Sequence, residues 1–99
     1  MAGQVGINPD GTIPVSAKEQ GERALERLAA ILESLGLDFT DLVELVTYHT
    51  DVLGDLADFR AINERFISSD FPAWTIVDVA SLARKELVIE IKAVASAKR

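Results

Sequence analysis

The fold of this chain is decided by its last apolar stretch, residues 87–95, which reads LVIEIKAVA. Every second side chain from Leu87 to Ala95 is apolar, whereas the alternate positions hold Glu90 and Lys92 beside two valines. A period of two residues is typical of a β-strand with one buried face. The stretch therefore predicts a strand whose apolar face packs on helices and whose other face can line a partner subunit or a cleft.

A first helix is predicted over residues 17–35 from leucines that recur at helical spacing. These are Leu25, Leu28, Leu32 and Leu35. Ser16 and Glu19 have the spacing of a capping box, in which each side chain can accept a hydrogen bond from the other residue's backbone N–H. Gly36 stands where a left-handed C-terminal cap residue belongs, so both ends of the helix carry a signal.

The segments between this helix and the last strand predict two more strands and a second helix. Residues 43–50 and 73–80 are rich in β-branched and aromatic side chains, which favours strands. A loop from residue 51 leads to an amphipathic helix of about residues 57–68. The short gap between residues 73–80 and 87–95 predicts an antiparallel hairpin.

Length, composition and charge limit the class of protein. A chain of 99 residues with 48% hydrophobic residues suits a single domain over residues 1–99. The element order predicts an α+β fold, in which a mixed β-sheet carries two helices on one face. The net charge of −6 argues against a nucleic-acid partner, because phosphate binding needs a basic surface. No membrane span and no secretory signal are recognisable, so a cytoplasmic protein is expected.

The sequence offers no pattern for a metal or a cofactor. It contains no cysteine, and a lone histidine, His49, makes no metal site, so we expect that side chain to be structural or surface-exposed. There is no glycine-rich phosphate loop and no Gly-x-Ser-x-Gly turn. We therefore expect neither a metal nor a cofactor.

Four motifs follow one another along the chain: GQVGI at residues 3–7, PDGTIP at residues 9–14, the helical segment 58–66, and FPA at residues 71–73 with the strand segment 88–93. In this order and at these separations they resemble the RidA/YjgF family. The first two are similar to its N-terminal stretch, the third looks like its second helix, and the last looks like its C-terminal hairpin. The resemblance implies a chorismate-mutase-like α+β fold that assembles as a homotrimer, with the sheets as an inner barrel and small-molecule clefts between subunits. It also implies hydrolysis of reactive enamines and imines to a keto compound and ammonia.

The resemblance points to four residues of a cleft. Glu90 matches a glutamate that orients or activates water, although periodicity alone also fits a solvated cross-strand charge. Trp74, Asn63 and Gly3 match positions that border the substrate. Two of these residues also have a plainer interpretation: Trp74 as a packing residue, and Asn63 as a helix side chain that bonds a neighbouring loop.

Two departures from the family pattern shape the functional expectation. Trp74 stands where deaminases of the family carry an arginine for the substrate carboxylate, and an indole cannot replace a bidentate guanidinium. The family's N-terminal strand pair has no counterpart ahead of Gly3. The expectation is therefore an imine or enamine deaminase or, alternatively, a non-catalytic ligand-binding or regulatory trimer. RNA cleavage, an older description of parts of the family, is disfavoured by the negative charge.

Overall fold

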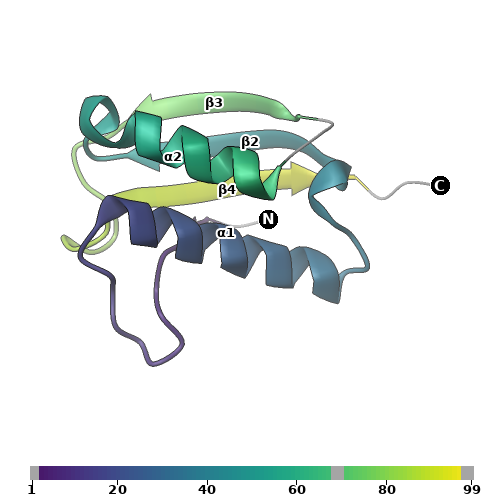
Figure 1. Ribbon diagram of the computed structural model, residues 1–99, viewed down its shortest axis with the longest axis horizontal. Helices are drawn as coiled ribbons and strands as arrows, with labels where there is room; N and C mark the ends of the chain where they lie inside the picture. The colour runs from purple at the N-terminus through teal and green to yellow at the C-terminus, as the bar shows by residue number, and fades with distance from the viewer. Residues whose placement is uncertain (1–2, 68–70, 97–99) are drawn as a thin grey trace.

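The computed structural model describes residues 3–67 and 71–96. Within these ranges, two α-helices cover one face of a four-stranded mixed sheet, which confirms the predicted fold class (Figure 1). The strands are β1 (Gln4–Val5), β2 (Leu42–His49), β3 (Ala73–Asp78) and β4 (Ile89–Ala95). The helices are α1 (Ala17–Ser34), α2 (Val52–Phe66) and a short 3-10 helix, η1 (Phe39–Asp41).

The strand order in the sheet is β1-β4-β2-β3, so β2 separates the two strands that were expected to form a hairpin. The hairpin prediction is wrong. β3 pairs in parallel with one edge of β2, and β4 pairs antiparallel with the other edge. The connecting segment bonds to the end of β2, where Val79 N–H donates to His49 O and Thr50 N–H donates to Val88 O. Residues 79–88 are enough to cross the roughly 10 Å between two strands that flank a third.

α1 begins where its sequence signals place it and ends slightly earlier. The Ser16 hydroxyl oxygen accepts the Glu19 backbone N–H at 3.1 Å, which satisfies a free donor of the first turn. Gly36 has a φ of +73°, the left-handed conformation that favours glycine after a helix. Leu35 is the C-cap and is 60% exposed, so it does not extend the buried stripe. That stripe consists of Ala24, Leu25, Leu28 and Leu32.

α2 begins well before residue 57, where the sequence pattern placed its start. Asp51 is the reason, because its carboxylate accepts the Gly54 backbone N–H at 3.2 Å and caps the helix. Gly54 therefore lies in the first turn, where a Cβ would collide with the Asp51 carboxylate. The earlier start places Asp55 on the buried face of the helix. The expected last residue, Ser68, lies outside the described residues.

The apolar core lies between the helices and one face of the sheet. Strand alternation points Leu45 of β2 and Ile89 and Ile91 of β4 toward the helices, and each is at most 1% exposed. This confirms the predicted packing of the apolar face of residues 87–95. From α2, Phe59 and Ile62 fill the opposite side of the core.

Gln20 of α1 ties two loops to the core. Its side-chain amide donates to Pro14 O at 2.9 Å and to Glu86 O at 2.8 Å, and its Oε1 accepts the Val88 N–H at 2.9 Å. The side chain is fully buried, so these bonds are shielded from water. Gln20 thereby holds the start of α1 against the segment that leads into β4.

Candidate functional site

Glu90 and Gly3 lie together on the face of the sheet opposite the helices. Glu90 belongs to β4, where it stands in register with Tyr48 of β2. A Cβ at Gly3 would collide with the Glu90 carboxylate, so the glycine leaves room for that side chain. Two of the four expected site residues are thus neighbours.

Trp74 and Asn63 lie on the other face, between α2 and the sheet. Trp74 is in register with the buried Leu45, and its indole Nε1–H donates to Thr47 Oγ1 at 2.9 Å. Asn63 is 5% exposed, and among the described residues its Oδ1 has no hydrogen-bond partner. The loop contact expected for Asn63 is therefore not made through that oxygen within the described part of the chain.

A cavity of about 340 Å³ opens between α2 and the start of β3. Its wall is made by Arg60, Asn63, Glu64, Phe71, Pro72 and Trp74. The volume lies near the lower end of the range for small-molecule pockets. Because the one polar atom of the indole is bonded to Thr47, Trp74 contributes an apolar surface to the cavity.

A second, wider hollow lies between the loop at residues 7–10 and α1, with a volume of about 830 Å³. It contains none of the expected site residues. Its Arg23 is already engaged, because the guanidinium donates to Asn8 Oδ1 at 3.0 Å and pairs with Glu26 at 2.5 Å. The smaller cavity beside Trp74 is therefore the better candidate for a ligand.

A buried chain of polar side chains leads from Trp74 into the core. Thr47 Oγ1 accepts from Trp74 and lies 2.8 Å from His49 Nε2, while His49 Nδ1 lies 3.2 Å from Asp55 Oδ1. Trp74 can only donate, so the Thr47 hydroxyl that accepts from it can in turn donate to a neutral His49. The remaining His49 proton then sits on Nδ1 and faces Asp55. His49 Nδ1 and both Asp55 carboxylate oxygens are buried without a well-aligned hydrogen bond among the described residues. The chain links β2, β3 and α2 at the back of the cavity.

Burial shifts the pKa values of His49 and Asp55 in opposite directions. Burial lowers the pKa of His49 below its usual 6.5, although the nearby Asp55 charge opposes the shift. Burial likewise raises the pKa of Asp55 above 3.8, and His49 opposes that shift. A lowered pKa keeps His49 neutral at pH 7, as its acceptor role toward Thr47 requires.

Comparison with known proteins places the chain in a family. Residues 1–97 match the family model described as Endoribonuclease L-PSP. The 2-iminobutanoate/2-iminopropanoate deaminase of Escherichia coli K12 is 36% identical over 98 residues, which cover 95% of this chain and 75% of the relative. The chain belongs to the RidA/YjgF family.

Other RidA/YjgF relatives agree in sequence and in fold. The RutC family protein YjgH of Escherichia coli K12 is 34% identical over 92 residues, which cover 92% of this chain and 70% of the relative. The crystal structure of the E. coli YjgF gene product has a TM-score of 0.90 at 35% identity, and the match covers 98% of this chain and 78% of that one. The fold expected from the resemblance is therefore the one observed.

Five residues of this RidA/YjgF chain were not picked out from the sequence as neighbours of the site. Arg60 and Glu64 line the cavity, and the buried chain of polar side chains behind it consists of Thr47, His49 and Asp55. His49 is fully buried, which fits the structural alternative expected for it and excludes the surface-exposed one. The sequence did carry a signal for the burial of His49. Every second residue of a strand faces the same side, so His49 shares its face with Thr47 and with the buried Leu45.

Neither a metal-binding cluster nor a membrane-spanning helix is found among the described residues of this RidA/YjgF chain. Over residues 3–67 and 71–96, no group of three His, Cys, Asp or Glu side chains could hold a metal ion. Over the same residues, each helix is too short or too polar to cross a membrane.

Proposed function

We propose that this RidA/YjgF chain hydrolyses small imines or enamines to a keto compound and ammonia. The observation that carries the proposal is the cavity beside Trp74, whose volume of about 340 Å³ suits a metabolite rather than a polymer. The reaction class is supported by the E. coli relative that is named a 2-iminobutanoate/2-iminopropanoate deaminase. Asn63 and Trp74 are the proposed substrate-binding residues from this face of the sheet.

Glu90 is the proposed general acid and base. In imine hydrolysis the oxygen of water bonds to the imine carbon, and the C–N bond then breaks to release ammonia and the carbonyl compound. A carboxylate can take a proton from the attacking water and return it to the leaving nitrogen. Gly3 supports this role by leaving space for the carboxylate, because any larger residue would collide with it.

The proposed site needs more than one copy of the chain. Glu90 and the cavity lie on opposite faces of one sheet, so a single chain cannot bring them to the same substrate. We propose a homotrimer in which the sheet faces that carry Glu90 turn inward and the clefts lie between subunits. Apolar side chains on that face, such as the 40% exposed Val94, would be covered by such contacts. Light scattering should give three times the 10.7 kDa chain mass, and a monomer would contradict the assembly.

Ammonia release tests the reaction. A serine or threonine dehydratase generates the enamine in situ, and the chain should speed ammonia formation above the buffer rate. Glu90→Gln should lower this rate by about 100-fold, the scale of general acid–base catalysis. Glu33→Gln is the control, because Glu33 is an exposed carboxylate on α1, away from the sheet face that carries Glu90, and its rate should stay unchanged. A trimer that gives no rate above buffer would refute the proposal.

The second candidate is a ligand-binding trimer without turnover. The observation that favours it is the bond from Trp74 to Thr47, which turns the only polar atom of the indole away from the cavity. A cavity with an apolar wall can hold a ligand without activating water. Binding of small carboxylates at the Trp74 cavity, with no ammonia released from any imine, would favour this candidate over the hydrolase.

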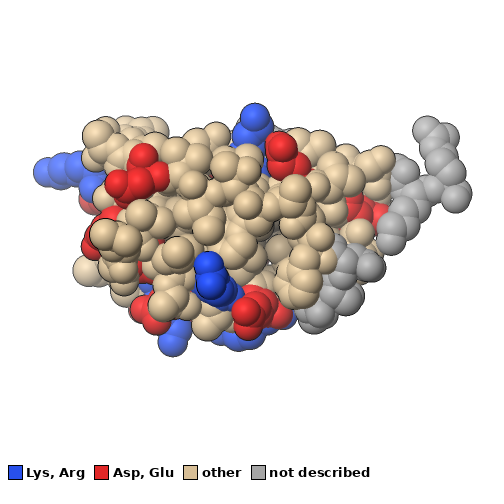
Figure 2. Space-filling model, turned by 90° about the horizontal axis from the view of Figure 1, so that it is seen from above, with Lys and Arg blue, Asp and Glu red and all other residues tan. Residues whose placement is uncertain are grey.

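We propose no role for nucleic acid, although the family model carries the description Endoribonuclease L-PSP. The net charge is −6, and phosphate backbones bind to continuous basic surfaces. Figure 2 shows one face of the molecule, where basic side chains are scattered among acidic and neutral ones. Strong, salt-dependent RNA binding at physiological salt would contradict this view.

A further inference from the structure

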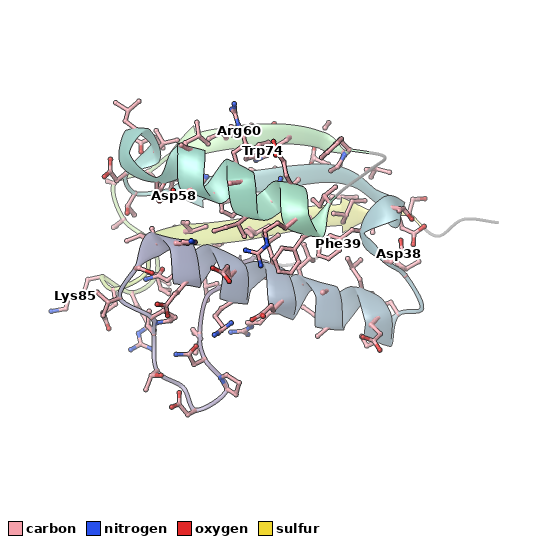
Figure 3. The ribbon with its side chains drawn as sticks, viewed as in Figure 1. Asp38, Phe39, Asp58, Arg60, Trp74 and Lys85 are labelled. Carbon is pink, nitrogen blue, oxygen red and sulfur yellow. The ribbon has the colours of Figure 1, made fainter. Side chains whose placement is uncertain are left out.

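Arg60 of α2 provides a positive charge at the wall of the cavity. It lies one helical turn before Asn63, and its Cζ is 6.0 Å from the centre of the Trp74 ring. Figure 3 labels the two side chains close to each other, where α2 and β3 overlap in the view. A guanidinium over an indole face is held by cation–π attraction, which orients its donors without using them up.

The guanidinium of Arg60 has no acidic partner within the described part of the chain. The ion pairs there involve Arg23, His49 and Arg84. Glu64 shares the cavity wall but lies outside ion-pair distance of Arg60. The five N–H donors of this exposed guanidinium are therefore not taken up by a carboxylate of the described residues, and Arg60 lines the cavity.

Trp74, Phe71 and Pro72 make the apolar part of the wall, and Asn63 and Glu64 are its other polar residues. The Trp74 donor is bonded to Thr47, and Phe71 and Pro72 add apolar surface. Glu64 contributes one negative charge, which disfavours a ligand with a second anionic group. The cavity therefore combines one cationic end with a flat apolar wall.

We infer that Arg60 is the anion-binding residue of this cavity, and that its ligand is a monocarboxylate with a planar apolar side group. The inference rests on the proposed function, in which this cavity receives the substrate. The carboxylate meets the guanidinium in a bidentate contact, and the planar group lies against the part of the Trp74 ring that borders the cavity beside Arg60. For the proposed hydrolase, this selects 2-imino acids with aromatic or other flat side chains.

Trp74 is the only tryptophan of the chain, so its indole N–H cross-peak in a proton–nitrogen NMR spectrum reports on the cavity without ambiguity. Three probes separate the contributions: 3-phenylpropanoate, its uncharged analogue 3-phenylpropanamide, and butanoate, which lacks the ring. Arg60→Gln removes the proposed anchor. Arg65→Gln is the matched control, because Arg65 lies on the same helix with its Cζ 6.0 Å from a different ring, that of Phe66.

We expect 3-phenylpropanoate to bind the wild-type chain about tenfold more tightly than either other probe, as for a charge-assisted contact that is partly open to water. Arg60→Gln should remove the advantage over the amide, whereas Arg65→Gln should leave it. Equal loss in both variants would indicate a general effect of net charge and would overturn the inference. So would the absence of 3-phenylpropanoate binding to the wild-type chain.

Ammonia release, measured on the same variants, separates this inference from the proposed function. If the wild-type chain hydrolyses imines and Arg60→Gln leaves KM for an aromatic 2-imino acid unchanged, the hydrolase stands and the anchor is wrong. If carboxylate binding depends on Arg60 while no imine is hydrolysed, the anchor stands and the hydrolase is wrong.

Discussion

Replacing Thr47 by valine tests the buried polar chain behind the cavity. Thr47 is fully buried, and its Oγ1 lies 2.9 Å from Trp74 Nε1 and 2.8 Å from His49 Nε2. Valine keeps the shape of threonine but leaves both nitrogens without a partner. Each unpaired buried polar group costs about 1–3 kcal/mol, so Thr47→Val should lower the free energy of unfolding by about 3 kcal/mol.

Urea unfolding at one fixed protein concentration measures this loss, with Trp74 fluorescence and far-UV circular dichroism as probes. A slope of about 1.5 kcal/mol per molar urea converts the loss into a midpoint lower by roughly 2 M. Thr47→Ser is the control, because it keeps the hydroxyl and gives up one methyl group, worth about 1 kcal/mol. If the valine variant is as stable as the serine variant, the polar chain does not stabilise the fold and the reasoning fails.

Three further predictions concern the same core. The pKa of His49 is lowered in the folded state, so the unfolded chain takes up its proton first as the pH falls below 6.5, and stability should decrease from pH 7 toward pH 5.5. His49→Gln should flatten this dependence of stability on pH in urea unfolding, and an unchanged slope would contradict the assignment of the slope to His49. The raised pKa of Asp55 acts in the opposite sense above pH 3.8. Gln20→Leu removes hydrogen bonds to three backbone groups, one buried and two partly buried, and should cost roughly 3 kcal/mol in thermal or urea unfolding. A loss under about 1 kcal/mol would speak against this role. Gly6→Ala places a Cβ against the backbone of Gln20, so it should cost about 2–3 kcal/mol, and a variant of wild-type stability would show that the backbone can yield there.

The elements of the fold were largely predictable because their signals are local. Ser16 and Gly36 delimit α1, and both act through backbone groups a few residues away. The alternation of residues 87–95 correctly predicted which face of β4 is buried. The start of α2 was missed because Asp51 was assigned to a loop, although its carboxylate caps the helix.

The candidate site was only partly predictable. The resemblance pointed to Glu90, Gly3, Trp74 and Asn63, and their roles remain proposals. Nothing in a linear pattern indicates that Glu90 and Trp74 lie on opposite faces of the sheet, because that depends on the register of both strands with β2. The sequence suggested that the cleft lacks a cation, whereas the folded chain places Arg60 at the cavity wall.

The sequence by itself determined where helices and strands form and which of their faces are apolar, because hydrophobic periodicity and caps act over a few residues. Only the tertiary structure decided that β2 lies between β3 and β4, and that Asp55, His49 and Thr47 meet behind Trp74. Strand pairing and contacts between a helix and a sheet join residues distant in sequence. Their geometry is set by how the whole core packs, which no local pattern contains.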